Sequence, residues 1–174
     1  MKNILIALLF LFAAAVPLKA QDAAVASKDE LLESFVKGDM MLDIYSTLII
    51  ERLEDEAEKA DFEKFNEEVK DMLTDIFVGS WSMLDIIDDG RFEEDGCELV
   101  LSINILSLKE AVEKRKAMNN KLDEHNETPL FPKAQSIESG YYRYIAHMLD
   151  LCGTMDKKLD AAFDKLIEAK GCRR

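Results

Sequence analysis

The sequence contains few of the residues from which catalytic and metal-binding sites are built. Among its 174 residues are three cysteines and two histidines, His125 and His147. No His-x-x-x-His or Cys-x-x-Cys pair is present, and neither histidine follows a glutamate by three positions, as in di-iron helix bundles. We therefore predict no metal site and no cofactor.

Motifs for nucleophilic, phosphate and calcium chemistry are also missing. Gly79-Ser80-Trp81-Ser82 lacks the glycine that closes a nucleophile elbow, and no glycine-rich phosphate loop occurs. The acidic stretch from Asp85 to Gly96 departs from the EF-hand pattern at its third position, Ile87, and at its twelfth. We expect no catalytic residues, although motif searches miss sites that a fold assembles from distant segments.

Long apolar runs occur only at the N-terminus. Lys2 precedes an apolar run from Ile4 to Val16, and the small Ala20 precedes a cleavage position, which together indicate a signal peptide over residues 1–20. The run is too short to span a membrane, and no later segment has eighteen uncharged apolar residues. We predict a secreted protein, periplasmic if the source is bacterial, with a single helical-bundle domain over residues 21–174.

Positive charge is scarce. Lysine and arginine number 22 against 35 acidic residues, which gives a formal net charge of −13. Loss of residues 1–20, which carry two lysines and no acid, would bring this charge to −15. Such a surface repels nucleic-acid phosphates and anionic lipid heads, so we predict no nucleic-acid partner. It favours solubility or a cationic protein partner.

Apolar residues, by contrast, make up 48% of the chain, and they recur at helical spacing. The clearest case is the stretch from Ile137 to Ile167, where steps of three and four predict one long amphipathic helix. The predicted stripe comprises Ile137, Tyr141, Tyr144, Met148, Cys152, Met155, Leu159, Ala162 and Leu166. Most of the charged residues in this stretch fall outside the stripe: Arg143, Asp150, Asp156, Lys157, Asp160, Asp164 and Lys165. A stripe of this length needs partner helices, which the rest of the chain supplies.

Three further helices are predicted from capping and turn residues. The first begins after Ser27, with Glu30 completing a capping box, and ends in a turn near residues 57–61. Asp61 caps the second, which stops at Asp88-Asp89-Gly90. The third begins at Cys97, and its predicted buried face comprises Cys97, Leu101, Ile105, Leu108, Val112 and Leu122. Residues 123–135 contain two prolines and are predicted to be a loop. The fold class is therefore all-α, a bundle of about four long, mostly antiparallel helices.

The three cysteines allow one disulfide and one free thiol. If the third and last helices are antiparallel about a turn near residue 130, Cys152 lies roughly 16 Å from Cys97 along the bundle. That exceeds the reach of a disulfide. Cys172 follows Gly171, where the helix can end and the tail can turn back. We predict a Cys97–Cys172 disulfide, with Cys152 free and buried.

Several residues are candidates for modification or binding. Asn126-Glu127-Thr128 matches the N-glycosylation motif, although Pro129 disfavours its use. A second set of candidates would line a pocket or an interface: Trp81, Tyr141, Tyr144, Met148 and Met155. The same aromatic and methionine side chains also commonly fill the core of a bundle or close its end, and that interpretation stays open.

Three functions remain after these exclusions. The first is a secreted, non-enzymatic protein that binds an extracellular protein partner through its helix faces. The second is a carrier that holds a small apolar, lipid-like ligand inside the bundle, and the third is an enzyme. A carrier should have a closed apolar cavity, whereas a protein-binding bundle should expose apolar residues.

Overall fold

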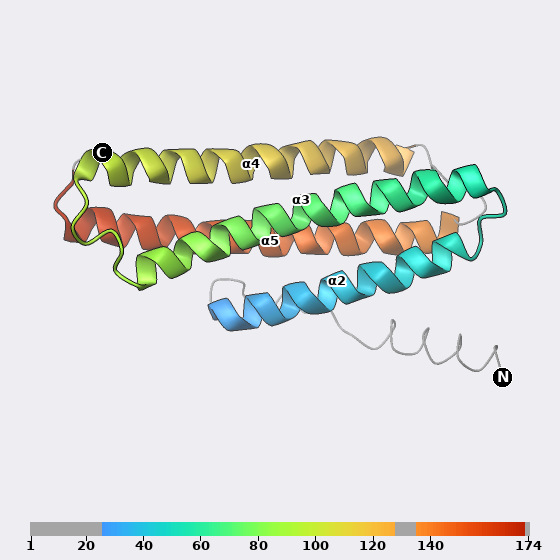
Figure 1. Ribbon diagram of the computed structural model, residues 1–174, viewed down its shortest axis with the longest axis horizontal. Coiled ribbons are helices and arrows are strands. Elements are labelled where there is room, and N and C mark those ends of the chain that lie inside the picture. Colours follow the sequence, from blue (N-terminus) through green and yellow to red (C-terminus); the bar gives the residue numbers. More distant parts are fainter. Residues whose placement is uncertain (1–25, 128–134, 173–174) are drawn as a thin grey trace.

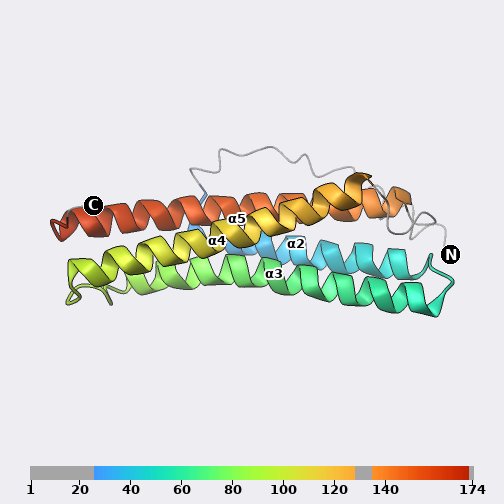
Figure 2. The same ribbon diagram turned by 90° about the horizontal axis from the view of Figure 1, so that it is seen from above.

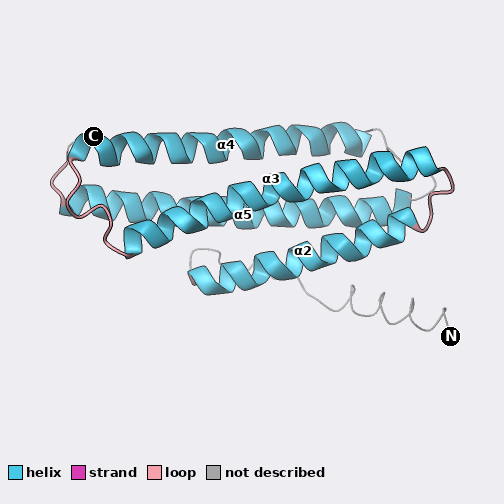
Figure 3. Cartoon of the chain, viewed as in Figure 1, coloured by secondary structure: helices cyan, strands magenta, loops and turns pink. Residues whose placement is uncertain are grey.

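The computed structural model describes residues 26–127 and 135–172. Its helices are α2 (Lys28–Ile50), α3 (Glu56–Asp88), α4 (Cys97–Glu127) and α5 (Gln135–Ala169). Successive helices run in opposite directions along one axis (Figure 1), and the described residues contain no strand (Figure 3). The predicted all-α bundle of four long, mostly antiparallel helices is confirmed. The predicted signal peptide lies outside the described residues.

Helix α5 is the central element of the bundle. It contacts α2, α3 and α4, and the last two helices also contact each other. Figure 1 shows α2 and α4 on opposite sides of the α3 and α5 pair, and Figure 2 shows the same arrangement from above. The α5 side chains in the core are Tyr141, Tyr142, Ile145, Met148, Leu149, Cys152, Met155, Leu159, Phe163 and Ile167. Each large apolar side chain buried in this way contributes about 1.5–3 kcal/mol.

The ends of the helices follow the local sequence. At α2 the capping box of Ser27 and Glu30 is confirmed: the Glu30 amide donates to Ser27 Oγ at 3.2 Å, and the Ser27 amide donates to Glu30 Oε2 at 2.7 Å. Helix α3 ends before Gly90 and α5 before Gly171, whose φ angles are 70° and 65°. This left-handed conformation favours glycine, and it lets the next amide bond back to the last turn.

The predicted turn at residues 57–61 is wrong by about one and a half helical turns. Helix α2 already ends at Ile50, and α3 begins at Glu56. The cap is Asp55, whose side chain accepts a hydrogen bond from the Ala57 amide at 2.7 Å, and not Asp61. The residues after Asp55 are good helix formers, so they join α3 once this cap is in place.

The predicted buried face of α4 is also wrong in part. Ile105 and Val112 are 64% and 50% exposed. The face that packs against α3 and α5 instead comprises Val100, Asn104, Ala111, Met118 and Leu122. This observed face contains fewer large apolar residues than the face that we predicted to be buried. Several large apolar side chains of α4 therefore remain exposed.

The structure also corrects the predicted loop and explains a glycine inside α2. The predicted loop over residues 123–135 is shorter, because α4 continues to Glu127. Gly38 does not interrupt α2: a Cβ atom at this position would lie 2.0 Å from Met148 Sδ. The glycine thus gives Met148 of α5 the space to pack against the α2 backbone, which offsets its low helix propensity.

The cysteine pairing is confirmed. Cys97 and Cys172 form a disulfide with a Cα–Cα distance of 5.4 Å, and Cys152 is a free, buried thiol. The Gly171 turn returns the chain end toward α4, as its amide donates to the Glu168 carbonyl and the Cys172 amide to the Ile167 carbonyl. The disulfide joins the start of α4 to the end of α5.

Candidate binding surfaces

Most of the predicted pocket or interface residues fill the interior of the bundle. Tyr141, Met148 and Met155 are fully buried, and Tyr144 and Trp81 are partly buried. Two grooves open on the surface of the described bundle: one of about 800 Å³ among α2, α3 and α5, and one of about 220 Å³ along α3 and α4. None of the five predicted residues lines either groove.

The tyrosines at the start of α5 make a sealed aromatic cluster. The Tyr141 ring lies 5.6 Å from the ring of Phe62 and 5.8 Å from that of Tyr142. The Tyr141 hydroxyl donates to Asn66 Oδ1 at 2.9 Å, and the Tyr142 hydroxyl donates to Glu138 Oε1 at 2.7 Å. Burial raises the pKa of both phenols. Buried, hydrogen-bonded tyrosines of this kind close the end of a bundle and are not poised for proton transfer.

Helices α3, α4 and α5 meet at a buried polar centre that the sequence analysis missed. Asp156 is only 4% exposed; it accepts a hydrogen bond from Ser80 Oγ at 2.7 Å, and its second oxygen lies 2.9 Å from Arg115 Nε. Gly153 makes room for this arginine, because a Cβ atom there would lie 2.5 Å from an Arg115 terminal nitrogen. Burial raises the pKa of Asp156, although the Ser80 hydrogen bond and the Arg115 charge oppose the shift.

A buried thiol lies beside this centre. Cys152 lies one helical turn before Asp156, and burial raises its pKa to about 12, with a smaller contribution from the Asp156 charge. A thiol at neutral pH is then almost entirely protonated and a poor nucleophile. His147 is also half-buried, which lowers its pKa. The polar centre pairs buried charges and fixes how the three helices meet.

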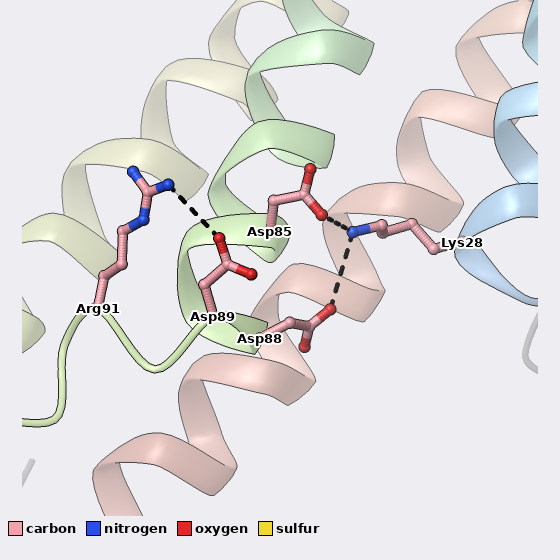
Figure 4. Close-up of polar contacts among 5 residues, drawn as sticks. All are labelled: Lys28, Asp85, Asp88, Asp89 and Arg91. Carbon is pink, nitrogen blue, oxygen red and sulfur yellow. Dashed lines mark hydrogen bonds and ion pairs between the residues drawn. The ribbon is translucent and has the colours of Figure 1, made fainter.

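Acidic residues near the α3–α4 turn are engaged by cations of the chain itself. Figure 4 shows Lys28 of α2 in ion pairs with Asp85 and Asp88, and Arg91 paired with Asp89. The Lys28 ammonium also lies 4.6 Å from the centre of the Trp81 ring, a cation–π distance. Trp81 thus positions a lysine in the structure. Among the described residues, no group of three or more His, Cys, Asp or Glu is arranged to hold a metal ion.

The outer face of α4 carries exposed apolar side chains in two rows. Leu99 and Leu106 are seven residues apart and form one row, and Ile105 and Val112 form the other. Their exposed fractions are 48%, 65%, 64% and 50% in that order. We call these four residues the α4 outer face. None of the helices that the structure describes covers it.

Two remaining predictions concern glycosylation and membrane spans. The side chain of Asn126, the candidate glycosylation site, lies outside the described part of the chain. No helix within the described ranges is long and apolar enough to cross a membrane. In comparisons of the sequence and of the structure with known proteins, no family model, curated protein or solved structure matches this chain significantly.

Proposed function

We propose that this chain is an exported, non-enzymatic protein that binds another protein through the α4 outer face. The observation that carries the proposal is the exposure of Leu99, Ile105, Leu106 and Val112 within four turns of one helix. Exposed apolar groups that gather on one face are typical of interaction sites, whereas single ones are ordinary. Burying the exposed half of each side chain against a partner would contribute about 1 kcal/mol.

The packing of the interior supports a surface role. Several buried polar groups hold the helices together: Ser80 and Arg115 hold Asp156, and Asn66 holds Tyr141. Large side chains also fill interior space, with Met148 packed into the space at Gly38. A protein partner at the surface therefore explains the structure better than a ligand inside the bundle.

Charge and cysteine use favour an extracellular, cationic partner. A net charge of −13 attracts a basic surface over a distance of about 8 Å at physiological ionic strength, which speeds encounter. A Cys97–Cys172 disulfide is stable in oxidising compartments and rare in the cytosol. Both the disulfide and the signal peptide proposed for residues 1–20 support a partner outside the cytosol.

Site-specific photo-crosslinking tests the proposal. A photoreactive residue at Ser102, which is exposed on α4 between the two rows, should crosslink a different protein in the compartment to which the source cells export the chain. The double variant Ile105→Gln, Leu106→Gln should lose at least nine-tenths of that product. Its thermal stability should stay unchanged, because both side chains are mostly exposed.

A matched control uses an apolar residue of similar exposure on another helix. Met40 of α2 is 61% exposed, and Met40→Gln should leave the crosslinked product at the level of the unchanged chain. Crosslinking of the chain only to a second copy of itself would contradict binding of a different protein. Retention of the product in the Ile105→Gln, Leu106→Gln variant would exclude the α4 outer face.

A further inference from the structure

The larger groove lies at the start of α2, where α3 and α5 extend further than α2 does. Helix α2 has 23 residues, whereas α3 has 33 and α5 has 35. Figure 1 shows α2 beginning well inside the end of the bundle at which α3 stops and α5 ends. The capping box of Ser27 and Glu30 sets this beginning, because it satisfies the first amides of the helix in place of a preceding turn.

The floor and the rim of this groove differ in chemistry. Its volume is about 800 Å³. The floor is apolar and comes from two helices: Leu84, Ile87, Ala161, Ala162 and Leu166. The rim is basic and comprises Lys28, Lys157, Lys158 and Lys165, with Asp88 and Thr154 also lining the groove. We call this site the lysine-rimmed groove.

Most of the lysines in this groove lack an ion-pair partner among the described residues, although the Ser27 hydrogen bonds and, less strongly, the Lys158 charge lower the pKa of Glu30. Lys28 pairs with Asp85 and Asp88, but Lys157, Lys158 and Lys165 make no ion pair with any residue that the structure describes. A chain of net charge −13 contains many acidic residues that could have formed ion pairs with these lysines. Four lysines and one aspartate line the groove, so an anionic head beside the apolar lining residues would meet more positive than negative charge there.

We propose that the lysine-rimmed groove binds an amphiphile with a single alkyl chain and an anionic head, a carboxylate, sulfate or phosphate. The alkyl chain would lie along Ala161, Ala162 and Leu166, and the head would meet Lys157, Lys158 or Lys165. This site lies outside the bundle interior and is separate from the α4 outer face, so it extends the protein's binding capacity beyond a protein partner.

The volume of the groove suits a small ligand. Small-ligand sites have volumes of about 300–1,000 Å³, and this groove lies within that range. The α5 residues that line it span Thr154 to Leu166, about 18 Å of helix, which suits an extended chain.

Calorimetric titration of the full-length exported protein with monomeric dodecanoate tests the proposal. One dodecanoate should bind per chain, and dodecyltrimethylammonium, with the same alkyl length and a cationic head, should bind at least tenfold more weakly. The variant Lys157→Gln, Lys158→Gln, Lys165→Gln should also lose at least tenfold in affinity. Equal binding of the two probes, or full affinity in the triple variant, would overturn the proposal.

Two further variants separate the groove from general surface attraction. Lys64 and Lys116 are exposed and also make no ion pair with the described residues, so Lys64→Gln, Lys116→Gln should leave dodecanoate affinity within twofold. Ala161→Trp adds a large ring to an exposed position of the floor and should reduce affinity at least tenfold without unfolding the chain. Equal loss in both would indicate nonspecific binding and contradict the site.

Competition and vesicle-binding experiments identify the molecule that carries the anionic group. A glutamate-rich peptide without an alkyl chain should not displace dodecanoate, and vesicles of anionic lipid should not retain the protein, because the rest of its surface is acidic. Displacement by the peptide would identify an acidic protein segment as the occupant, and retention would identify a membrane surface. The Ile105→Gln, Leu106→Gln variant should bind dodecanoate normally, which separates this site from the proposed protein interface.

Discussion

At one end of the bundle, α2 and α3 enclose the start of α5; at the other, α5 continues past the start of α2 and, among the described helices, lies with α3 and α4 (Figure 1). The closed end is held by Phe62, Tyr141 and Tyr142, whose rings and hydroxyls find partners inside. The open end is held by the Cys97–Cys172 disulfide, by Phe92 against Phe163, and by Lys170, which donates to the Glu93 and Asp95 carbonyls.

This difference shows where a small bundle can carry a binding site. The closed end gains stability from the burial of aromatic rings. The open end has fewer helices, and its crosslink allows a groove of about 800 Å³ to persist beside it. Both ends thus have buried side chains, and the open end also carries the disulfide.

Loss of the disulfide should have the largest effect on this contrast. In Cys97→Ser, Cys172→Ser, the unfolded chain gains the freedom of a loop that spans 75 residues, and the free energy of unfolding should fall by about 4 kcal/mol. Urea denaturation measures the change. Hydrogen exchange should increase first in residues 84–100 and 160–172, while amides near Tyr141 keep their protection relative to the global stability. A loss below about 1 kcal/mol would show that packing holds both ends.

Much of the contrast between the ends could be predicted from the sequence. The α5 stripe placed Tyr141, Met148 and Met155 on a buried face, and the spacing of the cysteines excluded Cys152 as a disulfide partner. The Ser27 capping box fixed the start of α2. These features depend on residue spacing and helix caps, which can be read from one segment of the chain without knowing what packs against it.

Features that depend on how the helices pack against one another could not be predicted from the sequence. Helix α4 has two apolar rows, and hydrophobicity alone favoured the row of Ile105 and Val112, but the bundle buries the face of Asn104 and Ala111. Periodicity grouped Asp156 with the charged residues that mostly fall outside the α5 stripe, and it did not predict that this carboxyl is buried. The Ser80 hydrogen bond and the approach of Arg115 from another helix make this burial tolerable.

Two matched glycine substitutions should sharpen the contrast. At the closed end, Gly140→Ala places a Cβ atom 2.5 Å from the Tyr45 ring, so repacking should cost about 2 kcal/mol. At the open end, no atom lies within 4 Å of a Cβ at Gly171, and Gly171→Ala should cost only the backbone strain at φ 65°, about 1 kcal/mol. Thermal and urea denaturation give both values. The opposite order would mean that the closed end is loosely packed.

Removal of one hydroxyl tests the polar part of the closed end. Tyr141→Phe keeps the ring but removes the donor to Asn66 Oδ1, so the free energy of unfolding should fall by about 1 kcal/mol. The lysine-rimmed groove should keep its affinity for dodecanoate, because it lies at the other end. Weakened binding in this variant would show that the ends are coupled.

The smallest effect is expected from the acidic surface near the α2–α3 turn. Glu58 and Asp61 are exposed on the first turns of α3. The double reversal Glu58→Lys, Asp61→Lys should change stability by no more than about 0.5 kcal/mol, as for ordinary surface substitutions. Guanidinium would screen the charges, so urea is the suitable denaturant. Failure of this variant to fold would contradict the view that these acids are only solvated.

Amide chemical-shift mapping by NMR tests most directly the claim that the open end binds and the closed end seals. On addition of dodecanoate to the ¹⁵N-labelled full-length protein, the largest shifts should occur at Leu84 and Ile87 of α3 and along Lys157 to Leu166 of α5. Amides around Phe62 and Tyr141 should move little. Shifts concentrated at Phe62, Tyr141 and Met148, with none along Lys157 to Leu166, would place the ligand inside the closed end and contradict the account.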